Sequence, residues 1–333
     1  MNIFNIDRIN TFLILVSFLV SCFLPFELFV IVYAILGPLH YLTEINWIKD
    51  KKYFLKDKNW LFLCLLLSAI VSIPLLFNLS FIKDIIGDSI SSFVFDNSIY
   101  TNAAIFLCFV SVIILRQSIS ERVKIVWIVL AFLVGIVLTN LNSFNLLFGT
   151  FIPTIIHVYF FTLLFMWYGS IKDSSKIGYI NIVLLALIPV FIFLIPDINW
   201  LLPSKNIQDV YVENKFYILN VTISKIIGLS DGTVFNFSDT ITTKIQLFIS
   251  FAYTYHYLNW FSKTSVIGWH KNLTSYKTIT IIVVWLLSVG LYSYNYRLGL
   301  VVLLFLSYLH VFLEFPINII SIKGIYSFYN KKL

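Results

Sequence analysis

Long apolar runs separated by short polar segments make up most of this chain. A helix needs about 20 mostly apolar residues to cross the hydrocarbon core of a bilayer, and ten runs approach that length. The pattern predicts an all-α, polytopic integral membrane helical bundle that forms a single domain over residues 1–333, with about ten transmembrane helices (8 to 10). The predicted helices lie near residues 9–25, 28–48, 59–77, 100–116, 123–140, 145–170, 178–196, 243–262, 276–294 and 298–320.

Lysines and arginines gather in alternate loops between these helices. Seventeen of the 23 lie on the same side of the membrane as the N-terminus, and six lie on the opposite side. Because cytoplasmic loops carry an excess of Lys and Arg, both termini are predicted to be cytoplasmic. Two long loops, 78–99 and 197–242, are then extracytoplasmic. The second contains the apolar stretch 216–229, which can form an interfacial or re-entrant helix.

The composition supports a membrane protein and excludes several soluble classes. Only 12% of the residues are charged and 59% are hydrophobic, whereas a soluble domain carries about 25% charged residues. A soluble enzyme, a nucleic-acid-binding protein and a disordered chain are therefore excluded. The net charge of +7 is interpreted as a topology signal, and the predicted environment is the lipid bilayer of a bacterial plasma (inner) membrane. Cys22, Cys64 and Cys108 lie in apolar runs without a C-x-x-C pair and are interpreted as packing residues.

Four of the five histidines lie within predicted spans and share a position pattern. His40, His157, His256 and His310 occupy the second, sixth, eighth and tenth helices, which all run from outside to inside. Each precedes the next cytoplasmic lysine by 7 to 15 residues, which is roughly 10–22 Å along a helix. The four intramembrane histidines therefore fall in one overlapping depth band. Ionisable groups inside a membrane are functional candidates by default.

Two of these histidines are followed by a carboxylate one helical turn later. Glu44 follows His40 and Glu314 follows His310, and residues four apart share one helix face. Histidine and carboxylate side chains on facing helices are typical of metal sites in helical bundles, and imidazole suits iron, copper or zinc. We therefore expect the four intramembrane histidines to hold a transition metal, such as iron, with Glu314 and Glu44 as catalytic carboxylates. The fifth histidine, His270, lies in a predicted cytoplasmic loop and is expected to be solvated.

Four functions agree with this pattern. The first is a metal-dependent membrane enzyme of the oxidase or oxygenase type, acting on an apolar small molecule, a lipid or an isoprenoid. The second is a proton-coupled transporter with a His/Glu relay, and the third is a b-type cytochrome with two histidines as haem ligands. The fourth is a non-catalytic scaffold that binds its partner through the loop 197–242. The sequence contains no P-loop, H-E-x-x-H or C-x-x-C-H motif.

Overall fold

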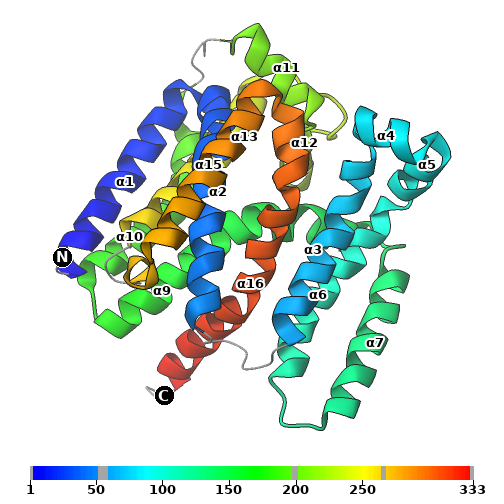
Figure 1. The fold of residues 1–333 in the computed structure, drawn as a ribbon. Coiled ribbons are helices and arrows are strands. Elements are labelled where there is room, and N and C mark those ends of the chain that lie inside the picture. Colours follow the sequence, from blue (N-terminus) through cyan, green and yellow to red (C-terminus); the bar gives the residue numbers. More distant parts are fainter. Residues whose placement is uncertain (1–2, 52–58, 197–201, 264–267, 331–333) are drawn as a thin grey trace. The chain divides into compact units, whose positions relative to one another are not determined.

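The computed structural model contains helices and the turns and loops that join them, with no strand among the residues that it describes, 3–51, 59–196, 202–263 and 268–330 (Figure 1). The helices are α1 (Ile3–Phe23), α2 (Pro25–Lys51), α3 (Asn59–Phe77), α4 (Ser80–Ile86), α5 (Asp88–Asp96), η1 (Ser98–Tyr100), α6 (Thr101–Leu115), α7 (Glu121–Leu138), α8 (Asn142–Asn145), η2 (Leu146–Phe161), α9 (Thr162–Asp173), α10 (Lys176–Leu194), α11 (Lys205–Glu213), α12 (Tyr217–Ile226), α13 (Thr240–Ser262), η3 (Trp269–Asn272), α15 (Ser275–Tyr294) and α16 (Tyr296–Asn330).

Eight helical segments within the described residues are long and apolar enough to cross a membrane. They are the segments Ile6–Phe23, Pro25–Lys49, Trp60–Phe77, Ser98–Leu115, Asn142–Asp173, Lys176–Leu194, Ser275–Tyr294 and Tyr296–Asn330. Each overlaps one of the ten predicted runs, so the all-α fold is confirmed, and the eight candidate spans support a multi-pass membrane protein. The last segment continues well past the predicted end at residue 320. The cytoplasmic placement of the termini stays a prediction.

The other two predicted runs form the helices α7 and α13. Neither is among the eight candidate spans, and the physical reason differs between the two helices. Three of the first four residues of α7 are charged, namely Glu121, Arg122 and Lys124. Only Gly135 of that helix is buried, so its apolar side chains face outward. In contrast, 17 of the 23 residues of α13 are buried, and many of these are Thr, Ser, Tyr, Asn or His. A helix that other helices cover needs no apolar exterior.

The chain divides into two compact units, each described here by itself. The first unit comprises residues 1–40, 158–278 and 321–333, and α13 packs there against α1, α10 and α12. Partly buried polar contacts fix these helices: Thr11 Oγ1 donates to Asn181 Oδ1 at 2.6 Å, and Asn181 Nδ2 donates to the Asp7 carbonyl at 2.8 Å. The Tyr255 hydroxyl of α13 donates to Asn10 Oδ1 at 3.3 Å. Hydrogen bonds of this kind specify helix register where apolar packing alone does not.

Most of the described part of the predicted loop 197–242, residues 202–242, is folded in the first unit. Helices α11 and α12 lie over the N-terminal end of α13, where the Asn220 amide donates to the Thr242 carbonyl at 2.8 Å. The Tyr211 hydroxyl donates to Gln246 Oε1 at 2.6 Å, and Gln246 Nε2 donates to the Pro25 carbonyl at 3.1 Å. Burial raises the pKa of Tyr211. This segment therefore joins α2 and α13 through buried contacts.

The second unit comprises residues 41–157 and 279–320, in which α6 packs against α3 and α7. Small residues allow the close approach of α6 and α7, because a Cβ added to Gly135 would lie 3.2 Å from the Cβ of Ala103. Cys64 and Cys108, on α3 and α6, are fully buried free thiols. Their burial agrees with the interpretation of these cysteines as packing residues.

The helix that carries His157 is irregular. Residues Leu146–Phe161 form π-helical turns, and the backbone at Thr154 leaves the helical region, with φ −116° and ψ −105°. Pro153 precedes this position, and a proline inside a helix removes a backbone hydrogen bond and disturbs the turn before it. The regular helix is therefore interrupted one turn before His157, as the proline in the sequence suggests.

Candidate metal-binding histidines

His40 and His256 form a close pair in the first unit. Their Nε2 atoms lie 3.1 Å apart, and the rings meet edge to face with centroids 4.6 Å apart. His40 is on α2 and His256 is on α13, with side chains 1% and 6% exposed. The indole of Trp260, one turn after His256, lies edge-on to His40 with ring centroids 5.6 Å apart. Two imidazole nitrogens thus lie within hydrogen-bond distance of each other in a buried, aromatic environment.

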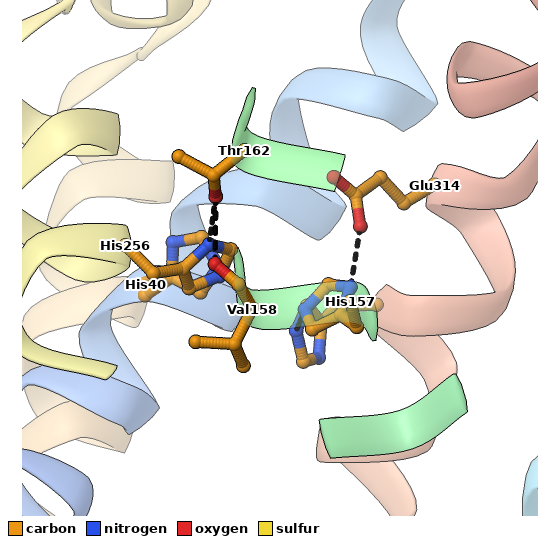
Figure 2. Close-up of polar contacts among 7 residues, drawn as sticks. His40, His157, Val158, Thr162, His256 and Glu314 are labelled. Carbon is orange, nitrogen blue, oxygen red and sulfur yellow. Dashed lines mark hydrogen bonds and ion pairs between the residues drawn. The ribbon is translucent and has the colours of Figure 1, made fainter. Parts of the chain in front are cut away.

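Thr162 selects the tautomer of His256 (Figure 2). Its hydroxyl donates to the Val158 carbonyl at 2.8 Å, and His256 Nδ1 lies 2.9 Å from the same oxygen. Because the only hydroxyl proton is used by Val158, Thr162 accepts from His256, which places the imidazole proton on Nδ1. The Nε2 atom, which faces His40, therefore carries a lone pair. Partners that hold the distal nitrogen in this way orient metal-ligating histidines.

A glycine lets the backbone of α2 approach α13 near this pair. A Cβ added to Gly37 would lie 3.3 Å from the Tyr257 hydroxyl oxygen, which is tighter than ordinary contact. Gly37 precedes His40 by three residues, and Tyr257 follows His256 directly. The absence of a side chain at Gly37 is therefore one cause of the short distance between the two imidazoles.

His157 and His310 form a second pair with the same geometry in the second unit. Their Nε2 atoms are 3.1 Å apart, and their rings meet at 74° with centroids 4.9 Å apart. His157 is on η2 and His310 is on α16, with side chains 2% and 5% exposed. The Tyr41 ring lies against His310, with centroids 5.7 Å apart. Each unit thus contains one buried pair of imidazoles that meet through Nε2.

Two buried carboxyl groups accompany the second pair. Glu314 Oε2 lies 2.7 Å from His157 Nδ1 (Figure 2). When it is ionised, Glu314 accepts only, and it then favours the His157 tautomer with the proton on Nδ1 and a lone pair on Nε2. The carboxyl group of Glu44 interacts electrostatically with that of Glu314, and their residues are 3% and 2% exposed. Two interacting carboxylates in an apolar interior do not both stay charged unless a cation or a proton compensates them.

The spacing within each pair suits two ligands of one metal ion. If each Nε2 is about 2.05 Å from an ion, a separation of 3.1 Å gives an N–metal–N angle of about 98°. This value lies between the angle of about 109° in a tetrahedral site and that of about 90° in an octahedral one. Two trans ligands of one haem iron would lie about 4 Å apart. Neither pair therefore holds a haem between its own two rings.

The sequence-predicted ligands are all buried, and several are suited to a metal ion. Glu314 contacts His157 within the second unit, and His270 lies exposed on η3 as expected. Whether all four histidines share one ion stays a prediction. The residues that could hold a metal ion are His40, His157, His256, His310 and Glu44, each of which offers one ligand atom from a buried side chain.

Sequence reasoning did not find the residues that support these pairs. No spacing in the sequence marks Thr162, Gly37 or Trp260, because each contacts a residue on a different helix. The only available hint was the position of Gly37 directly before Pro38 and near His40. A glycine near a candidate ligand is typical of a position where two helices approach closely.

No protein-family model, no curated protein and no solved structure matches this chain. The functional argument therefore rests on the geometry of the two histidine pairs.

Proposed function

We propose that this protein is an integral membrane metalloprotein that binds transition-metal ions through the buried pairs His40–His256 and His157–His310. The observation that carries the proposal is the repeated Nε2–Nε2 separation of 3.1 Å. In His256, the imidazole proton is held on Nδ1 by Thr162, so that Nε2 is available as a ligand. Neutral imidazole nitrogens favour iron, copper or zinc over magnesium or calcium.

The proposed reaction is of the oxidase or oxygenase type and acts on a lipid or isoprenoid. Histidine and carboxylate ligands together suit non-haem iron, and Glu44 and Glu314 would supply catalytic carboxyl groups beside His157 and His310. The ion would supply oxygen activation or redox chemistry. The buried position of these residues on apolar helices supports a substrate that arrives through the lipid phase. A bacterial plasma membrane is the proposed location.

Metal analysis of the purified protein tests the metal-binding proposal. The wild-type chain is expected to contain one or two equivalents of a transition metal after expression with iron, copper or zinc salts. Replacing His256 or His310 with Ala should remove metal, whereas His270→Ala, in the exposed histidine, should retain it. If the two pairs bind separate ions, each single variant loses one of two equivalents. Absence of stoichiometric metal, or its retention when all four intramembrane histidines are Ala, would refute the proposal.

Oxygen consumption tests the reaction class. The metal-loaded protein in lipid vesicles is expected to consume oxygen in the presence of a membrane lipid extract, and Glu314→Gln should lower the rate. The same measurement on His270→Ala controls for general damage. A wild-type protein that retains its metal but consumes no oxygen with any lipid fraction would contradict the oxygenase assignment and leave metal binding intact.

A proton-coupled transporter is the second candidate, and the second unit supplies its support. Glu44, Glu314, His157 and His310 form a chain of interacting ionisable groups that reaches across two helices and η2. Buried acids and histidines mark proton pathways in membranes. Reconstituted vesicles that acidify or alkalinise only with the wild-type protein, and not with Glu314→Gln, would favour this function. The scaffold alternative is less supported, because the described part of the loop 197–242 is largely folded against α2 and α13.

A further inference from the structure

The segment between α3 and α6 is a folded helical hairpin in the second unit (Figure 1). Helices α4 and α5 meet at Gly87, whose φ of +89° is a conformation that favours glycine. The Gly87 N–H donates to the Lys83 carbonyl at 2.9 Å, and Lys83 Nζ forms a 2.9 Å ion pair with Asp88. These contacts fix the angle between the two short helices. We name residues 80–96 the interfacial hairpin.

This hairpin is attached at the boundary of two candidate membrane spans. Ser91 of α5 is 1% exposed, and its hydroxyl donates at 2.8 Å to the carbonyl of Phe77, the last residue of the span Trp60–Phe77. That bond satisfies one of the carbonyls that a helix end leaves without an internal partner. The next span begins at Ser98, two residues after the hairpin ends. Both ends of the hairpin therefore lie at the ends of candidate spans, where the helices would leave the hydrocarbon core of the bilayer.

Large apolar side chains project outward from the hairpin. Phe81 and Ile85 lie one turn apart on α4 and are 51% and 78% exposed. Ile90 and Phe93 lie three residues apart on α5 and are 54% and 69% exposed. Residues at these spacings share a helix face, so each helix presents an apolar strip that no part of the described chain covers.

A separate face of α5 is polar. Ser92 is exposed about 160° around the helix from Ile90. Ser89 and Asp96 are exposed between Ser92 and Phe93, whereas Ser91 points toward α3. Helix α5 thus has three faces, one packed on protein, one apolar and one polar. This arrangement is typical of a helix that lies in the plane of a membrane surface.

We propose that the interfacial hairpin is embedded in the headgroup and acyl boundary of the bilayer, with Phe81, Ile85, Ile90 and Phe93 among the lipid chains. The hairpin is continuous with a candidate membrane span on each side, Trp60–Phe77 and Ser98–Leu115. The hairpin carries one lysine against three aspartates, Asp84, Asp88 and Asp96, so attraction to anionic headgroups does not drive its binding. The partner is therefore the apolar part of the lipid, and binding is independent of anionic lipid content.

Site-directed spin labelling tests this placement. A variant with Cys22, Cys64 and Cys108 replaced by Ala receives single cysteines at Ile85, Phe93, Ser92 or Asp96, and is reconstituted in phosphatidylcholine vesicles. Collisions with oxygen, which concentrates in lipid, are compared with collisions with a water-soluble nickel chelate. The adjacent positions Ser92 and Phe93 form a matched pair on different faces of one helix. Thermal unfolding of each labelled protein confirms that the fold is retained.

The expected result is a change of sign between the two faces. The logarithm of the oxygen-to-nickel collision ratio should be positive at Ile85 and Phe93 and negative at Ser92 and Asp96, and adding phosphatidylglycerol should not shift it. Negative values at all four positions would place the hairpin in water and overturn the proposal. Low collision rates with both reagents at Ile85 and Phe93 would indicate that protein, such as a second copy of the chain, covers the apolar strip, and would also overturn it.

Discussion

Replacing Thr162 with Val tests how the first histidine pair is prepared for a ligand. The substitution keeps the shape of the side chain and removes the hydroxyl that lies 2.9 Å from His256 Nδ1. Without metal, His256 can move its proton to Nε2 and donate to His40, so the cost in stability is at the low end of about 1–3 kcal/mol for an unsatisfied buried donor. With metal bound, Nε2 of His256 is a ligand, so the proton cannot move there and Nδ1 keeps an unsatisfied N–H.

The effect of Thr162→Val should therefore appear mainly in metal affinity. Removing a partner that orients a ligating histidine costs about 10- to 100-fold in affinity, which is about 1.4–2.7 kcal/mol. Competition with a chromophoric chelator measures the dissociation constant in detergent. Thr162→Ser is the matched control, because it retains the hydroxyl and should bind within about threefold of the wild type. Equal losses in the Ser and Val variants, or no loss in Val, would refute the assigned role of the hydroxyl.

Three other substitutions test contacts of the histidine pairs and the burial of Lys263. Glu314→Gln replaces the carboxyl group 2.7 Å from His157 Nδ1 with a neutral amide and should weaken metal binding by about 10- to 100-fold; unchanged affinity in the chelator assay would contradict that role. Gly37→Ala places a Cβ 3.3 Å from the Tyr257 hydroxyl oxygen, so it should lower the melting temperature and the metal affinity, and the double variant with Tyr257→Phe should recover part of both; no recovery would show that this clash is not the cause. Burial lowers the pKa of Lys263 from 10.5 to about 8. The unfolded chain therefore binds more protons between those values, and stability should rise as the pH increases from about 8 to 10.5; Lys263→Met should reduce that slope in thermal unfolding, and an unchanged slope would contradict the assignment.

The helices were predictable from the sequence wherever lipid exposure controls composition. The eight apolar segments follow directly from runs that lipid must solvate. Helix α13 shows the limit of that signal, because its side chains contact protein and are therefore free to be polar. Helices α4, α5, α11 and α12 are short and stabilised by contacts such as Ser91 with Phe77 and Tyr211 with Gln246. Contacts between distant segments leave no local periodicity in the chain.

The sequence predicted which histidines form the candidate site, but it did not predict which histidine contacts which. The four intramembrane histidines were recognised because their helices run in the same predicted direction and place them at a similar predicted depth. The direction follows from the count of spans, and the depth follows from the spacing to the predicted cytoplasmic lysines. That His256 meets His40, and His310 meets His157, depends on which helices are neighbours. Glu44 lies only five residues before Lys49, so the sequence also allowed it to reach the headgroups. Its burial at 3% exposure places it inside the protein instead.

X-ray absorption spectroscopy of the metal-loaded protein tests the central claim most directly, because it reports the atoms bound to the ion. The two histidine pairs predict a shell of nitrogen or oxygen atoms at about 2.0–2.1 Å, with the multiple-scattering features of imidazole. These features should weaken in His256→Ala and in His310→Ala and persist in His270→Ala. A first shell without imidazole scattering, or a spectrum that all three variants leave unchanged, would contradict metal binding by the buried histidines.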